Sequence, residues 1–152
     1  MRKTVAARGR GQEQGWLDLD RLARAELTSE DPDHPLEGAL AGGGPGGWRA
    51  ADGGEQTIRL LFDDPQRVRR IRLEFEELEQ ARTQEFALSA WAAGEAPRLL
   101  RRQQYTFGPP TTTAEVETCE VDLEGVVGLE LVIVPDIGGG PARASLALLR
   151  VA

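Results

Sequence analysis

The sequence predicts an all-β protein, an antiparallel β-sandwich, on three observations. From about residue 56 onward, apolar and polar residues alternate, as they do in strands with one buried and one solvent-facing surface. The strand-like runs recur at similar spacing and are separated by turn residues, many of them Gly and Pro. The pattern contains no long amphipathic helix. Together these features are typical of two packed antiparallel sheets.

The chain divides into a short arm and one domain. Residues 1–15 are rich in Gly, Gln and Arg without apolar periodicity, which predicts a mobile N-terminal arm. The remaining residues, 16–152, suffice for a single core but are few for two. The domain opens with WLDLDRLARAEL, which fits either one helical turn or an extended lead-in to a strand. We favour a short turn that inserts Trp16 into one end of the core.

Two strands are expected in the middle of the chain, over TIRLLFD and RRIRLEF. The segment DDPQ between them, residues 63–66, predicts a turn in which proline fixes φ. Val68 is out of phase with Ile71 by one residue. We therefore expect a β-bulge near Arg69.

Further strands complete the sandwich, for a total of about seven or eight. Cys119 alternates with Val121 and Leu123, so its side chain is expected to point inward as a small hydrophobe. The strand-like runs are QEFALSAWA, RLLRRQQYTF, EVETCEVDL, GLELVIVP and ASLALLRV, and the segments between them are GEAP, GPPTTT, EGVV and DIGGGPAR.

The charge and the cysteine content of the chain limit its expected binding partners and its expected cellular location. The chain has 18 basic and 25 acidic residues and a net charge of −7, which disfavours binding to nucleic acid or to an anionic membrane. Its single cysteine cannot form an internal disulfide, and the positively charged start lacks the apolar run of a secretory signal. We therefore expect a cytoplasmic protein.

A resemblance runs through nearly the whole chain after the arm. The segments AELTSED, GALAGGGPGGWRA, GEQTIRLLFDDPQRVRRIRLEF, QEFALSAW and ARASLALLRV follow one another in an order similar to that of galactose-binding-like domains of the discoidin, or coagulation factor type C, family. The resemblance implies a jelly-roll topology for the sandwich. The matching positions are Thr28 and Ser29, Ala39, Trp48, Phe62 and Asp63, the segment 68–73, and Ser145 with Leu146.

The resemblance also implies a function without chemistry. Domains of this family are usually non-catalytic and bind a sugar, a lipid head group or a protein through loops at one end of the sandwich. This chain departs from the calcium-binding members, because Ala41 and Leu148 stand where those members carry acidic residues. Calcium needs several hard oxygen ligands, so we expect no calcium here, and no other metal or cofactor.

The glycine-rich segment 38–50, GALAGGGPGGWRA, does not read as a phosphate-binding loop. A Walker loop needs Lys and Ser or Thr after its last glycine, whereas Gly47 is followed by Trp48 and Arg49. A dinucleotide loop needs a following helix, and none is predicted. The segment is expected to be a flexible connection in which glycines supply positive φ. For Trp48 we favour a core plug over a platform for a ligand.

His34, in EDPDHPLEG, is the only histidine of the chain. With Asp31 and Asp33 it could hold a metal ion, but a single histidine without a partner at ligand spacing is far more often a surface loop residue. We expect no metal site and keep His34 as a candidate ligand contact. Arg49, in the loop region expected to carry the ligand, is a second candidate.

Two polar strand segments could also serve a ligand. On the run that starts at Arg101, alternate residues share one face, so Arg101 and Tyr105 point the same way. The alternative is that the arginines pair with glutamates across a solvent-facing sheet, each pair contributing about 0.2 to 1 kcal/mol. The candidate contacts here are Arg82, Gln84 and Tyr105, and the candidate glutamate partners are Glu74, Glu76 and Glu117.

Catalysis is not expected. The glutamates of EFEELE, residues 74–79, could suggest a glycosidase, but a solvated strand end explains them better. With one histidine, one cysteine and no clustered ligands, the chain lacks the usual groups of an active site. We expect a module that binds carbohydrate or another small polar ligand. The alternative is a protein-interaction or assembly module, which a contiguous apolar patch or a homo-oligomer in solution would favour.

Overall fold

The computed structural model describes residues 15–40 and 47–152 and confirms the all-β fold. Residues 1–14 of the expected arm and residues 41–46 of the glycine-rich segment lie outside these ranges. Within the described ranges, no helix is long and apolar enough to cross a membrane. The elements in chain order are α2 (Leu19–Leu22), β1 (Ala23–Leu27), α3 (Glu37–Leu40), β2 (Trp48–Gly53), β3 (Gln56–Glu76), β4 (Arg82–Ala92), β5 (Arg98–Phe107), β6 (Ala114–Val134), β7 (Arg143–Leu146) and β8 (Leu148–Val151).

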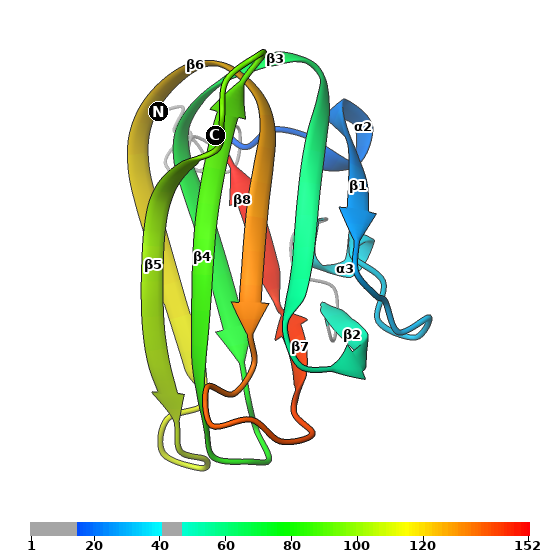
Figure 1. The fold of residues 1–152 in the computed structure, drawn as a ribbon, viewed down its shortest axis with the longest axis vertical. Coiled ribbons are helices and arrows are strands. Elements are labelled where there is room, and N and C mark those ends of the chain that lie inside the picture. The colour runs from blue at the N-terminus through cyan, green and yellow to red at the C-terminus, as the bar shows by residue number, and fades with distance from the viewer. Residues whose placement is uncertain (1–14, 41–46) are drawn as a thin grey trace, which may run out of the picture.

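Two long strands, β3 and β6, run through both layers of the sandwich. Figure 1 shows both ribbons arching over the same end of the molecule. The first part of β3 pairs with the last part of β6, and the second part of β3 pairs with the first part of β6, all antiparallel. One layer has the order β1-β3-β6-β4-β5, and β8 pairs with the second part of β3 in the other. A short sheet of β2 and β7 flanks this body.

The expected turn at DDPQ is a corner within one strand, which corrects the sequence-based prediction. The register between β3 and β6 shifts between Leu61 and Gln66, between Gln66 and Val68, and between Val68 and Arg70. The last of these shifts confirms the expected bulge near Arg69. Bulges let a strand change direction while the ladder continues on both sides. Two expected strands are therefore joined in β3, and the same happens in β6, where Gly125 adopts φ +68°.

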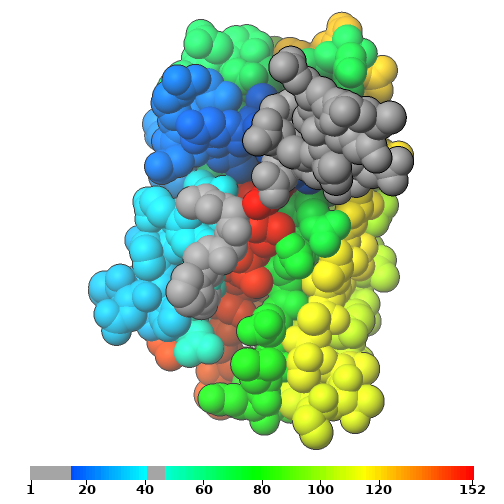
Figure 2. Space-filling view, turned by 180° about the vertical axis from the view of Figure 1, so that it is seen from behind, coloured from blue at the N-terminus to red at the C-terminus, as the bar shows by residue number. Residues whose placement is uncertain are grey.

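The final expected strand, ASLALLRV, is in fact two strands with different partners. β7 pairs with β2, whereas β8 pairs with β3, and the change occurs at Ala147. The N–H of Ala147 still donates to the carbonyl of Glu74, at 2.8 Å. Figure 2 shows the segment that includes α3, in cyan, beside these red C-terminal strands, and α3 packs against β8.

The core follows the alternation seen in the sequence. Inward side chains of the two layers interlock, and the rings of Phe75 and Phe86 stack with centroids 5.3 Å apart. Cys119 is buried and has no disulfide, as expected. Trp48 is completely buried, which confirms the favoured reading of a core plug. The glycine preceding it is required by geometry: Gly47 has φ +52°, and a side chain there would collide with the carbonyl oxygen of Leu146.

Trp16 occupies a different place from the one predicted. The expected helical turn is present as α2, but Trp16 precedes it and is only half-buried. The guanidinium of Arg70 lies 4.3 Å from the centre of the Trp16 ring, and that of Arg150 lies 5.8 Å away. Trp16 is therefore held by cation–π stacking at the surface rather than inserted into the core.

Candidate functional site

The segment that follows β1 is fastened to β2 at one end of the sandwich, in the lower part of Figure 1. The N–H of Asp31 donates to the carbonyl of Arg49 at 2.9 Å, and the N–H of Arg49 donates to the carbonyl of His34 at 3.1 Å. These two bonds place His34 and Arg49, both candidates from the sequence, on adjacent backbone segments. We call the set of Asp31, His34, Arg49 and Arg143 the loop-end cluster.

Arg143 joins the cluster through β7. It lies opposite Gly53 in the β2–β7 pairing, and its Nη1 is 3.8 Å from the Asp31 carboxylate. The Arg143 side chain is 41% exposed, and Arg49 is exposed as well. The Nδ1 atom of His34 is buried without a hydrogen-bond partner among the described residues. The cluster thus combines guanidinium donors, a carboxylate acceptor and an unsatisfied imidazole nitrogen.

Polar side chains fix the backbone of this segment. The hydroxyl of Ser29 donates to the Gln56 side chain at 2.7 Å and accepts from the N–H of Ala51 at 3.0 Å. The carboxylate of Glu30 accepts from the N–H of Leu36 at 2.6 Å. Because both ends of the segment are tied in this way, the cluster is held in place before any ligand arrives.

Within residues 15–40 and 47–152, no three His, Cys, Asp or Glu side chains are arranged to hold an ion. Of the two positions that depart from the calcium-binding pattern, Leu148 is a buried residue of β8 and Ala41 lies outside the described residues. The expectation that this segment holds no metal stays a prediction.

Arg82 and Gln84 lie inside the sandwich, which corrects their assignment as ligand contacts. The Arg82 side chain is 1% exposed and stacks on the Phe107 ring, 4.8 Å from its centre. Its Nε donates to Glu77 at 2.7 Å, and its Nη1 donates to the carbonyl of Pro135 at 2.7 Å. Arg82 thus joins two loops from within, and Glu77 is held by an ion pair rather than solvated as its sequence position suggested.

Gln84 extends this buried network to β6. It accepts from Nη1 of Arg82 at 3.3 Å and donates to Glu115 at 3.2 Å. Burial, reinforced by the neighbouring Glu117 carboxylate, raises the pKa of Glu115 to about 7. At Glu77, partial burial acts to raise the pKa, but the bond from Arg82 and those from two backbone N–H groups outweigh it, so the pKa lies below 4.5.

Glu115 makes the stability of the fold dependent on pH. The pKa of Glu115 is higher in the folded state than in the unfolded chain. Its contribution to the free energy of unfolding is therefore fully present below about pH 4.5 and is lost as the pH rises through 7. Relative to the wild type, Glu115→Gln is expected to be more stable at pH 8 by about 2 to 3 kcal/mol and equal near pH 4.5. Urea unfolding at both pH values measures this. A difference that does not change with pH would contradict it.

Tyr105 is separated from the loop-end cluster. It lies on β5, the strand at the opposite edge of the main layer from β1, whose following loop carries the cluster. Its ring is half-buried and meets the Phe107 ring edge to face at 4.9 Å. The alternative expected from the sequence, pairing of an arginine with a glutamate, is confirmed for Arg101 on the same strand, which donates to Glu117 at 3.0 Å. Contact of Tyr105, His34 or Arg49 with a ligand stays a prediction.

Arg143 is the member of the cluster that sequence reasoning missed. It follows DIGGGPA, a stretch that reads only as a turn. Its position beside Asp31 depends on the pairing of β7 with β2, which joins segments about ninety residues apart and leaves no local pattern.

Comparisons with known proteins identify solved structures that have a similar fold. No family model matches the sequence, and a search of curated proteins finds no match. Among solved structures, the chain is similar to the family 32 carbohydrate-binding module of NanJ from Clostridium perfringens in complex with galactose, with 15% identity, a TM-score of 0.63, and coverage of 90% of this chain and 96% of that one. A second module from the same organism, CpGH89CBM32-4 in complex with GlcNAc-α-1,4-galactose, gives 12% identity, a TM-score of 0.67, and coverage of 90% and 93%.

A third similar structure is the family 32 module of AlyQ in complex with 4,5-unsaturated mannuronic acid, with 12% identity, a TM-score of 0.60, and coverage of 86% and 95%. These three chains share the galactose-binding-like β-sandwich that the resemblance in the sequence implied. The chain therefore has the fold of family 32 carbohydrate-binding modules.

Proposed function

We propose that this protein is a non-catalytic carbohydrate-binding module and that the loop-end cluster is its binding surface. The observation that carries the proposal is the shared fold: nearly the whole chain superposes on modules whose structures contain a bound sugar. The cluster supports it, since it gathers polar groups from the anchored segment after β1 and from the adjoining β2–β7 sheet. Modules of this kind act by holding a ligand, so no reacting group is needed.

The cluster matches the hydrogen bonding of a sugar. A sugar hydroxyl both donates and accepts, so it is best held between a donor and an acceptor. Arg49 and Arg143 supply planar donors, and the Asp31 carboxylate supplies the acceptor. The unsatisfied Nδ1 of His34 is a further group that a hydroxyl or bound water would satisfy. Trp48 is completely buried and therefore takes no part in stacking on the sugar ring.

The absence of catalysis belongs to the same proposal. Cys119 is buried in the core, and His34 has no carboxylate hydrogen-bonded to its Nδ1 in the described structure. Neither residue is therefore arranged as a nucleophile with its base. The cytoplasmic location expected from the sequence stays a prediction.

A thermal-shift screen of the whole chain against galactose and a panel of neutral and acidic sugars tests the proposal. A ligand that binds only the folded state at ten times its Kd adds about 1.4 kcal/mol, which raises the Tm by about 3 to 6 °C. Arg49→Ala is expected to weaken the binding of the active sugar about tenfold or more. The matched control is Arg102→Ala, on exposed β5, which is expected to leave binding unchanged.

Two results would contradict the proposal. One is the absence of a shift with every sugar, which would favour a protein-interaction module and direct the next measurement to the oligomeric state in solution. The other is a shift that Arg49→Ala and Arg102→Ala reduce equally, because sugar binding would then take place away from the loop-end cluster.

A further inference from the structure

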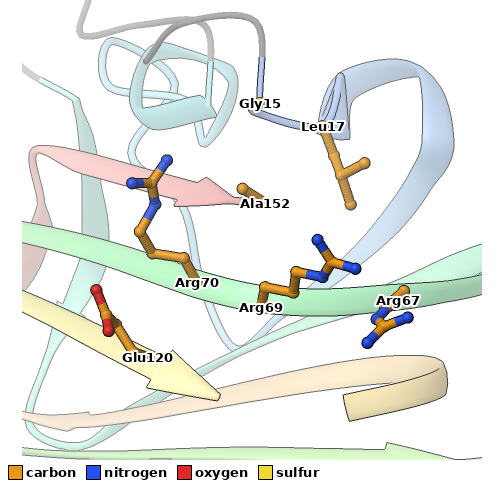
Figure 3. A pocket seen from close by; sticks show the side chains of 7 residues that line it. All are labelled: Gly15, Leu17, Arg67, Arg69, Arg70, Glu120 and Ala152. Carbon is orange, nitrogen blue, oxygen red and sulfur yellow. The ribbon is translucent and has the colours of Figure 1, made fainter. Parts of the chain in front are cut away.

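A separate cavity lies at the other end of the sandwich, near the corner of β3. Figure 3 shows it between β3 and the segment that leads into α2. Its volume is about 600 Å³, which lies within the range of small-molecule sites. It is lined by Gly15, Leu17, Arg67, Arg69, Arg70, Glu120 and Ala152. Three of these residues are arginines and one is a carboxylate, so the lining is net positive although the chain as a whole has a net charge of −7.

The β-bulge explains how two consecutive arginines face the same cavity. In a regular strand, neighbouring side chains point to opposite faces of the sheet. Here the N–H groups of Arg69 and Arg70 both donate to the carbonyl oxygen of Ala152, at 2.6 and 2.8 Å, and the register with β6 shifts at this point. A bulge of this kind redirects a side chain. In Figure 3 both side chains rise from β3 on the side of Gly15 and Leu17.

The two bulge arginines make no ion pair within the described part of the chain, although Glu120 lies opposite Arg70 in the β3–β6 ladder. Arg67 is held by Asp122 at 2.9 Å and by Glu124 at 3.6 Å. Neither Arg69 nor Arg70 has an ion-pair partner among the described residues. Charged groups lining a cavity without partners are available to a ligand of opposite charge.

Arg70 is also held in a fixed orientation. Its guanidinium lies on the Trp16 ring, and stacking on the flat face leaves the N–H groups at the edge free to donate. Its Nε is buried without a hydrogen-bond partner in the structure described. A buried donor without an acceptor is costly, and a bound oxyanion would supply the missing acceptor.

We propose that this cavity binds a small acidic molecule through its carboxylate, sulfate or phosphate group, with Arg69 and Arg70 as the two donors. A guanidinium pair suits the flat or trigonal arrangement of oxygens in these groups. Leu17 offers an apolar wall for the rest of the ligand, because the cavity is larger than a bare inorganic anion requires. Glu120 offsets part of the positive charge and gives one acceptor for a hydroxyl. The site is independent of the loop-end cluster.

Isothermal titration calorimetry of the whole chain at low ionic strength tests this site. The probes are inorganic phosphate, inorganic sulfate and glucuronate, with glucose as the neutral counterpart of glucuronate. Saturable binding of one anion per chain is expected for at least one acidic probe. Preference for glucuronate would identify an acidic sugar as the source of the oxyanion, whereas preference for phosphate or sulfate would identify an ester of that kind.

Variants with opposite expected effects make the test specific. Arg69→Gln is expected to weaken anion binding about tenfold or more, and Arg69→Lys to weaken it less, because the charge remains while the planar fork is lost. Glu120→Gln is expected to strengthen binding, since it removes a repelling charge. Arg102→Gln makes the same change of net charge on β5 and is expected to have no effect. Arg69, Glu120 and Arg102 are exposed, so these variants should fold, which circular dichroism verifies.

The proposal is overturned by any of three results: no saturable binding of any acidic probe, equal weakening by Arg69→Gln and Arg102→Gln, or no strengthening by Glu120→Gln. Arg49→Ala separates it from the proposed carbohydrate function. That variant is expected to lose sugar binding at the loop-end cluster and to keep anion binding at the bulge, so either site can fail alone.

Discussion

Replacing Arg82 by alanine is expected to lower the free energy of unfolding by about 3 to 5 kcal/mol. The substitution removes the donor to three acceptors at once: the Glu77 carboxylate, the Pro135 carbonyl and the Gln84 side chain. It also removes the group stacked on Phe107. The acceptors stay largely buried, so water replaces the lost bonds poorly. The loops on either side, which Arg82 joins, lose their common anchor.

Urea unfolding at pH 7 measures this loss. The matched control is Arg102→Ala on the adjacent strand, where an exposed arginine without such partners is expected to change stability by no more than about 0.5 kcal/mol. If Arg82→Ala cost as little as the control, the buried network would not hold the loops, and Arg82 would have to be reconsidered as a group free to meet a ligand.

Replacing Trp48 by alanine is expected to cost a similar amount, about 3 to 5 kcal/mol, because it leaves a large cavity in the core. Trp48 is completely buried at the start of β2, opposite Leu146 of β7. The loss should also loosen the β2–β7 pairing that carries Arg49 and Arg143. Reduced stability is therefore expected to be accompanied by weaker sugar binding.

Trp48→Phe separates packing from hydrogen bonding. The indole Nε1 is buried and has no partner within the described residues, so phenylalanine gives up no bond there. The cost is expected to be less than about 2 kcal/mol, with sugar binding retained. Chemical denaturation and the sugar titration measure both properties. A near-neutral Trp48→Ala together with lost sugar binding would mean that Trp48 serves the ligand directly.

Much of the fold could be predicted because strand alternation is local. The run RLLRRQQYTF coincides with β5, residues 98–107, and the inward positions of β4 follow a strict period of two. The bulge near Arg69 could also be predicted, since one residue out of phase is visible in the sequence itself. These features need no knowledge of which strands are neighbours.

The corners could not be predicted in the same way. DDPQ has the composition of a turn, and whether such a segment ends a strand or bends it depends on the partner strand. Here β6 bends beside β3, so the ladder continues on both sides of the corner. The division of β7 from β8 at Ala147 has the same origin, because it is a change of partner and leaves no local mark.

The candidate site was predicted only in part, and one error was avoidable. Arg82 and Gln84 have the same parity along β4 as Phe86 and Leu88, so alternation alone placed them on the buried face. Their polar chemistry suggested the opposite. By contrast, the meeting of Asp31 with Arg143 depends on long-range pairing, and the shared direction of the two bulge arginines becomes visible only in three dimensions.

The most direct measurement is a titration of the isotope-labelled protein, followed by amide chemical shifts, with the sugar that gives the largest thermal shift. Shifts are expected to concentrate in residues 31–34 and 49–51, which carry and flank the loop-end cluster, with residue 143 moving along with them. Residues 67–70 at the bulge are expected to stay unchanged with a neutral sugar. Shifts confined to other surfaces, or none at saturating sugar, would contradict the assignment of this protein as a module that binds carbohydrate through its loop end.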